Sequence, residues 1–170
     1  TEYLERKFKA EIVTGIEADD ACVIECQDNK NAVIQGLDKD YYGQNCRFFN
    51  VNRPDEGIQE CNQFGKLWLD DKNDVRGIGR LHLYWQICSN DTSDNYAANC
   101  FSDKKWAGKS AYKALVDCKN DVEAWNKMKQ VFQLLYPEPK TVIGWRNDPI
   151  EITWDYVLNE MFMMARMLKF

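Results

Sequence analysis

A cysteine pattern that occurs twice constrains this chain more than any other feature. The two copies are, in order, Tyr42-x3-Cys46-x14-Cys61-x6-Trp68 and Tyr96-x3-Cys100-x17-Cys118-x6-Trp125. Each copy has one more cysteine upstream, Cys26 in the first and Cys88 in the second. A repeat of this kind predicts two copies of one supersecondary unit. We expect the two units to span about residues 20–72 and 80–136 of a single domain over residues 1–170.

The cysteine count favours a disulfide framework over a metal site. The chain has seven cysteines and one histidine, and none of the spacings is C-x2-C, so a zinc site is not expected. Bridged cysteines are typical of secreted proteins. Six residues are candidates for structural disulfides: Cys26, Cys46, Cys61, Cys88, Cys100 and Cys118. Cys22 has no counterpart in the second copy and is the candidate for an unpaired thiol.

Repeat symmetry leaves two ways of pairing the six cysteines. The first joins Cys26 to Cys46 and Cys88 to Cys100, and leaves Cys61 and Cys118 to bridge the copies. The second joins Cys46 to Cys61 and Cys100 to Cys118, and leaves Cys26 with Cys88. Either pairing would lock two units into one body, with each bridge contributing roughly 2–4 kcal/mol.

Apolar periodicity predicts an all-α fold, a disulfide-stapled helical domain built from the two related units. Apolar residues recur at helical spacing near residues 4–12, 20–26, 54–68, 78–88 and 110–135. Residues 141–145 could form a short strand or an extended crossing. A last helix is expected over about 149–168, because Asp148, Pro149 and Glu151 stand where a cap, a first-turn proline and a capping-box acid belong.

The four aromatic residues of the repeat, Tyr42, Trp68, Tyr96 and Trp125, are expected to lie in the core. Each tryptophan follows a cysteine by seven residues, about two helical turns, so the two side chains would share a face. The alternative is that the tryptophans stack on a ligand.

Charge and hydropathy exclude several classes of partner. The formal net charge is −5, and the basic residues form no cluster, which argues against nucleic-acid binding. No stretch approaches the roughly 20 apolar residues of a membrane span.

No catalytic, cofactor or metal site is predicted. His82, the only histidine, stands between two leucines in an expected helix and has no partner that would make it a general base. The sequence lacks a G-x-S-x-G motif and a glycine-rich phosphate loop. We therefore expect a protein that is not an enzyme.

The repeated Cys-Tyr-Cys unit resembles a known family. Cys26, Tyr42 and Cys46, followed by Cys88, Tyr96 and Cys100, are similar to the paired motifs of the bicycle effector proteins of gall-forming and other aphids. The resemblance covers about residues 26–100, and its motif is loose. It implies a secreted salivary-gland protein that is delivered into plant tissue and binds a partner there, with no chemistry implied.

Two functions from different classes compete on these grounds. The first is a secreted effector that binds an unknown host protein or other plant macromolecule through an exposed aromatic and apolar patch, with Trp106, Trp145 and the methionine-rich tail as candidates. The alternative is an all-α carrier of the odorant-binding type, with a small apolar ligand as its partner. A mitochondrial intermembrane-space subunit and an enzyme are less favoured.

Overall fold

A computed structural model describes residues 2–91, 96–144 and 146–166, and within them the fold is mixed rather than all-α. Six α-helices and four small sheets alternate along the chain. The elements, in order, are α1 (Glu2–Phe8), α2 (Ala18–Asp28), β1 (Ile34–Gly36), the 3-10 helix η1 (Lys39–Gly43), β2 (Arg47–Asn50), the 3-10 helix η2 (Pro54–Glu56), β3 (Ile58–Glu60), β4 (Lys66–Leu69), β5 (Val75–Ile78), α3 (Arg80–Ile87), β6 (Asn90–Asp91), β7 (Tyr96–Ala97), α4 (Gly108–Leu115), α5 (Asp121–Leu135), β8 (Lys140–Ile143), β9 (Pro149–Ile152) and α6 (Trp154–Ala165).

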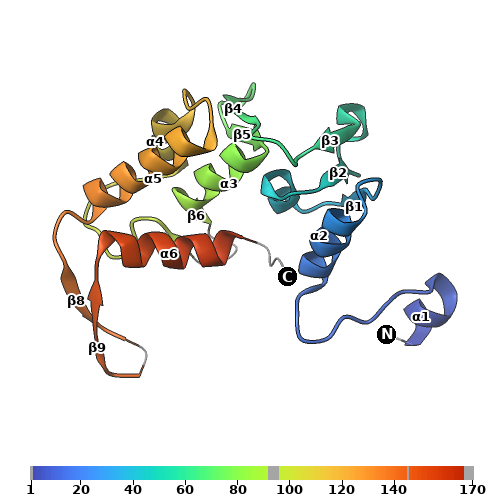
Figure 1. Ribbon diagram of the computed structural model, residues 1–170, viewed down its shortest axis with the longest axis horizontal. Coiled ribbons are helices and arrows are strands. Elements are labelled where there is room, and N and C mark those ends of the chain that lie inside the picture. The colour runs from blue at the N-terminus through green and yellow to red at the C-terminus, as the bar shows by residue number, and fades with distance from the viewer. Residues whose placement is uncertain (1, 92–95, 145, 167–170) are drawn as a thin grey trace.

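The strands form short local sheets. β2 is the central strand of the largest one, where it pairs parallel with β1 and antiparallel with β3. β4–β5, β6–β7 and β8–β9 are separate antiparallel pairs. The β8–β9 hairpin extends away from the helices that precede and follow it (Figure 1).

The prediction of an all-α fold is therefore wrong, most clearly over residues 54–68. The expected helix there ends after η2, because Gly57 adopts a φ of 63°. Gly65 has a φ of 76° and abuts the Ile78 carbonyl so closely that a Cβ would overlap it. A glycine in the left-handed region stops a helix at little cost. The apolar residues at helical spacing are instead distributed over two strands, with Ile58 in β3 and Trp68 in β4.

The last helix begins later than expected. Pro149–Ile152 is β9, paired with β8, so the capping interpretation of Asp148, Pro149 and Glu151 is wrong. Thr153 caps α6 instead, and its hydroxyl accepts a hydrogen bond from the Tyr156 N–H at 3.3 Å. Asn147, with a φ of 60°, turns the β8–β9 hairpin. Residues 149–152, whose local sequence resembles a first helical turn, therefore pair with β8 as a strand.

The two copies of the cysteine pattern do not fold alike, so the prediction of two related helical units is also wrong. Residues 20–72 contain most of α2 and then mainly strands, from β1 to β4. Residues 80–136 contain α3, α4 and α5, together with the two-residue strands β6 and β7. In the first copy, Cys46 and Cys61 flank the paired strands β2 and β3. In the second copy, Cys88 and Cys118 lie near the ends of α3 and α4.

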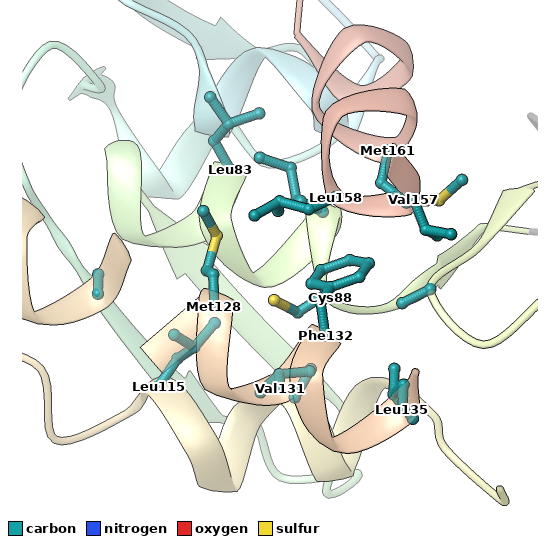
Figure 2. Packing of buried hydrophobic residues seen from close by; sticks show 14 of the residues in the cluster. Leu83, Cys88, Leu115, Met128, Val131, Phe132, Leu135, Val157, Leu158 and Met161 are labelled. Atoms are coloured by element: carbon teal, nitrogen blue, oxygen red, sulfur yellow. The ribbon is translucent and has the colours of Figure 1, made fainter. Parts of the chain in front are cut away.

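The disulfide-stapled fold is wrong as well, because all seven cysteines are free thiols. Two apolar clusters hold the described residues together. The first core contains Phe48 of β2, Val23 of α2 and Ile78 of β5. The second core joins α3, α4, α5 and α6 (Figure 2).

The second core is built by one face of each of its helices. Phe132 and Met128 of α5 are fully buried and meet Val157 and Leu158 of α6 within the same cluster. Cys88, just after α3, lies in the middle of this cluster as an unbridged thiol. Burial of apolar surface therefore does the stabilising work that the sequence had suggested for disulfides.

No helix in the described part of the chain combines the length and apolar content that a bilayer crossing needs. α1 stands apart from the rest of the structure, and none of its residues is buried (Figure 1).

Candidate functional site

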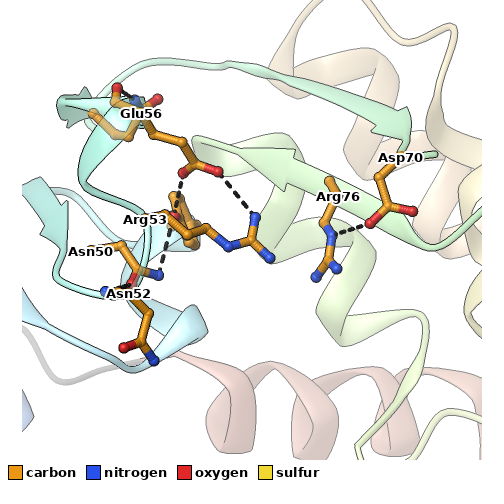
Figure 3. Close-up of polar contacts among 8 residues, drawn as sticks. Asn50, Asn52, Arg53, Glu56, Asp70 and Arg76 are labelled. Carbon is orange, nitrogen blue, oxygen red and sulfur yellow. Dashed lines mark hydrogen bonds and ion pairs between the residues drawn. The ribbon is translucent and has the colours of Figure 1, made fainter. Parts of the chain in front are cut away.

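A cleft of about 640 Å³ lies beside the β4–β5 hairpin. Its walls are the hairpin on one side and the segment from β2 through η2 on the other, and residues of α3 form its floor. We refer to it below as the cleft. Figure 3 shows polar side chains from both walls.

Residues from both strands of the hairpin line the cleft. Lys66 and Trp68 of β4 lie opposite Ile78 and Arg76 of β5 in the antiparallel register, and all four line the cleft. Successive side chains of a strand point to opposite faces, so these four share one face. The Trp68 side chain is 40% exposed, and the Lys66 ammonium lies 5.5 Å from the centre of its ring.

Asp70 fixes the turn of this hairpin and the position of Arg76. One carboxylate oxygen accepts the N–H groups of Lys72 at 3.0 Å and Asp74 at 2.8 Å. The other accepts a hydrogen bond from Arg76 Nε at 2.8 Å. The Asp74 N–H, followed by Arg76, holds the pKa of Asp70 below its ordinary value. Arg76 is thereby held at the cleft with its terminal nitrogens unused by this pair.

The opposite wall is a hydrogen-bonded chain of polar residues. Arg53 donates to Glu56 at 3.0 Å, and the Tyr42 hydroxyl donates to the same carboxylate at 2.7 Å. Asn50 Nδ2 donates to the Tyr42 oxygen at 3.3 Å, and the Asn52 N–H donates to Asn50 Oδ1 at 3.0 Å. Burial, reinforced by the bond to Glu56, raises the pKa of Tyr42 to about 12. The phenol is therefore a neutral donor at physiological pH.

His82 forms the floor of the cleft and is neutral. Its side chain is buried, stacks on Trp85 with ring centres 5.3 Å apart, and meets the edge of Tyr42. Burial, together with the nearby charges of Lys39 and Arg76, lowers the pKa of His82 to about 4. Its Nδ1 is buried and has no hydrogen-bond partner among the described residues.

Gly77 allows this histidine to sit beneath the hairpin. A Cβ at Gly77 would lie 2.6 Å from His82 Cδ2 and 2.5 Å from Leu67 Cδ2. Both distances are below ordinary carbon–carbon contact. The small residue in β5 is therefore what brings the strand and the imidazole together.

An ion pair closes the far end of the cleft. Lys39 of η1 lies 2.7 Å from Asp91 of β6, in a region that Gln86 of α3 also lines. Gln86 Nε2 donates to Asp40 at 2.6 Å, while the buried Oε1 of the same side chain has no partner in the described part of the structure. His82 and Gln86 thus each carry a buried polar atom without a hydrogen-bond partner among the described residues.

Ser89 is the hydroxyl residue of the described cleft that could serve as a nucleophile. It donates to the Gln86 carbonyl at 3.0 Å and not to His82. A nucleophile needs a base within hydrogen-bond reach, and no such pair occurs at the cleft among the described residues. Nor do these residues contain a group of three His, Cys, Asp or Glu side chains that could hold a metal ion.

The structure brings three of the four repeat aromatic residues to the cleft. Tyr42, Trp68 and Tyr96 line it, whereas Trp125 packs against the second core beside Phe162. The prediction that Trp68 shares a core with Cys61 is wrong, because Cys61 is fully buried and Trp68 is exposed. Cys118 and Trp125 do pack against one core, as predicted.

Sequence reasoning missed the two arginines of the cleft and placed its exposed patch elsewhere. Lys66 and Trp68 stand two residues apart in one strand, and Arg76 and Ile78 stand two residues apart in the next. This alternation at strand period was the available signal for the hairpin. Of the patch candidates, Trp106 is half-buried and donates to the Cys88 carbonyl at 2.7 Å. Trp145 lies outside the described residues, and Met163 of the methionine-rich tail is 64% exposed.

Two pairs of cysteines lie close together. Cys46 and Cys61 are a pair of the second expected pairing, whereas Cys88 and Cys118 are a pair in neither. Cys61 donates its N–H to the Cys46 carbonyl at 3.0 Å, and contact with the Cys61 thiol raises the pKa of Cys46. Cys26 packs against the same core, Cys88 and Cys118 lie together in the second core, and Cys100 lies 4.0 Å from the Tyr136 hydroxyl. Cys22 is exposed. No disulfide joins the six candidates in the described part of the structure.

No protein-family model, no curated protein and no solved structure matches this chain.

Proposed function

We propose that this protein is a secreted effector that binds a host plant macromolecule through the cleft and catalyses no reaction. The observation that carries the proposal is the cleft itself, where the exposed Trp68 ring and the guanidinium groups of Arg53 and Arg76 line one space. Tryptophan and arginine are the residues that most often dominate binding energy at interfaces.

The polar lining disfavours the carrier alternative. A carrier for small apolar ligands needs a cavity lined mainly by apolar side chains. Four cationic side chains line the cleft instead: Lys39, Arg53, Lys66 and Arg76. Moving an apolar molecule into this space would leave these charges poorly solvated.

Capture from plant tissue extract tests the proposal. The tagged protein is compared with Trp68→Ala, which removes the exposed ring, and with Val122→Ala, a control at a position on α5 that is 71% exposed and outside the cleft. We expect wild type and Val122→Ala to retain one plant component equally. Trp68→Ala should retain roughly tenfold less, since losing such a side chain at an interface costs more than about 1.4 kcal/mol.

The recovered component should have the same mass before and after incubation, as expected for binding without reaction. Equal retention by Trp68→Ala and wild type would show that the cleft is not the binding site. A component that is converted during incubation would point to an enzyme.

A further inference from the structure

The cleft concentrates positive charge on an acidic protein. Among the described residues, its lining includes the four cations named above and two carboxylates, Glu56 and Asp91, whereas the whole chain carries a net charge of −5. Adding Asp70, which pairs with Arg76 at the hairpin turn, still leaves the cations in excess. A concave surface with one sign of charge attracts ligands of the other sign.

The two guanidinium groups retain donors for a ligand. Arg53 and Arg76 extend toward the cleft from opposite walls (Figure 3). Among the described residues, the side chain of each makes one hydrogen bond, through Nη1 to Glu56 and through Nε to Asp70. A guanidinium has five N–H donors and matches a carboxylate in a bidentate fork. Lys66 adds a cation that makes no ion pair within the described residues.

The neutral groups of the cleft suit a hydroxylated ring. Trp68 offers an indole that is 40% exposed, and the negative face of an aromatic ring attracts the C–H groups of a saturated ring. At the floor, His82 Nδ1 and Gln86 Oε1 are buried polar atoms without a partner among the described residues, and their side chains are more than nine-tenths buried. A hydroxyl can both donate and accept, so it can satisfy either atom.

We propose that the cleft binds an acidic oligosaccharide. A carboxylate of the sugar pairs with Arg53 and Arg76, a pyranose ring lies on Trp68, and a hydroxyl reaches His82 or Gln86 at the floor. This inference rests on the proposed use of the cleft as the binding site. An acidic peptide would supply the carboxylate, but its aspartates and glutamates carry neither a ring for Trp68 nor a hydroxyl for the buried atoms.

Calorimetric titration of the full chain with three probes tests this inference. The probes are a galacturonic acid tetramer, the same tetramer with its carboxylates methyl-esterified, and a tetraglutamate peptide. We expect the acid tetramer to bind at least tenfold more tightly than either of the other probes, with an affinity that falls as salt is raised. Arg53→Gln, Arg76→Gln, Lys66→Gln and Trp68→Ala should each weaken its binding several-fold, to about tenfold for the arginines.

Lys119→Gln is the matched charge control, because Lys119 is exposed in the loop between α4 and α5 and does not line the cleft. Its affinity should equal that of wild type. Lys66→Gln breaks no ion pair of the described structure, so it reports on binding even if an arginine variant unfolds. Thermal melts of each variant identify any loss of fold.

Two results would overturn the inference. Equal binding of tetraglutamate and the acid tetramer would make the cleft a site for acidic peptides. Absence of binding to the acid tetramer, or binding that the cleft variants leave unchanged, would exclude an acidic saccharide there. If capture of a plant component still depended on Trp68, the proposed function would stand while this inference failed.

Discussion

At the scale of single residues, the unusual property of His82 is its low pKa, which results mainly from burial. It lies between the hairpin and Trp85 and accepts no positive charge easily, because its side chain is buried and Lys39 and Arg76 are close. The sequence placed His82 between two leucines of a helix, and the structure buries its side chain against Trp85 and Tyr42. What the sequence could not supply was the neighbours, which come from η1 and β5 and meet α3 only after folding.

The depressed pKa of His82 makes stability depend on pH. The unfolded chain protonates this residue below about pH 6.5, whereas the folded protein does so only near pH 4. Protons therefore bind the unfolded state preferentially in this window, so the free energy of unfolding falls as the pH drops from about 6.5 to 4. The loss attributable to His82 is about 3 kcal/mol as an order of magnitude.

Urea unfolding of wild type and His82→Phe across this pH range measures the effect. Phenylalanine keeps a ring against Trp85 but cannot be protonated. We expect the difference in unfolding free energy between the two proteins to shift in favour of His82→Phe as the pH falls. Carboxylates titrate in both proteins and cancel in this difference. A difference that stays constant with pH would contradict the burial and the cationic surroundings of His82.

At the scale of elements, helices that pack on a core were predicted well, and strand pairs were not. The sequence located α2, α3 and α5 because their apolar residues repeat at helical spacing, but it did not separate α4 from α5, whose boundary is the cap at Asn120. The β4–β5 hairpin was missed because its strands have only four residues each, too short for a clear alternation. Its partner residues are also separated by a turn whose geometry depends on Asp70.

The cleft was missed for the same reason. Its cations are spread over η1, the residue before η2, β4 and β5, so no cluster of lysine or arginine appears in the sequence. They come together only when the hairpin faces the β2–η2 segment. Recognising Gly65 as a position of close backbone approach, rather than as a member of a helical stripe, would have pointed to this arrangement.

Gly65 gives the clearest test of the hairpin and its junction with α3. Gly65→Ala would place a Cβ against the Ile78 carbonyl at a residue with a φ of 76°. Gly57→Ala is the matched control, since Gly57 has a φ of 63° and nothing within 4 Å of the added carbon. Backbone strain alone costs on the order of 1–3 kcal/mol.

We expect Gly65→Ala to lower the free energy of unfolding by at least about 1 kcal/mol more than Gly57→Ala, because overlap with backbone adds to the strain. Chemical denaturation followed by circular dichroism gives both values. Equal losses at the two positions would mean that Gly65 does not approach Ile78 closely and that the hairpin is arranged differently.

At the scale of the whole molecule, α3 joins the two cores. Ile78 just before it belongs to the first core, and Leu81 within it belongs to the second. Arg80, at the start of the helix, forms a two-pronged ion pair with Asp121 of α5, with bonds of 2.7 and 2.9 Å. Among the described residues, no disulfide connects the two cores. Any coupling between their unfolding therefore depends on the segment around Gly79 and on the contacts of α3.

This connection predicts that the two cores unfold together. Phe48 is fully buried in the first core and Phe132 in the second, and replacing either by alanine should cost about 3–5 kcal/mol. If the cores are one cooperative unit, each variant lowers the midpoint seen by tryptophan fluorescence and the midpoint seen by far-ultraviolet circular dichroism to the same extent. Most tryptophans that touch a core lie against the second core, so fluorescence reports mainly on that half.

Phe48→Ala is the decisive variant, because its cavity is in the half that fluorescence reports least. A fluorescence midpoint that falls with Phe48→Ala shows that loss of the first core destabilises the second. An unchanged fluorescence midpoint, with an additional early transition in circular dichroism, would instead show two units that unfold separately. The cleft, whose lining includes Ile78 from the first core and Trp68 from the hairpin, would then open before the second core melts, and its ligand would stabilise the first transition alone.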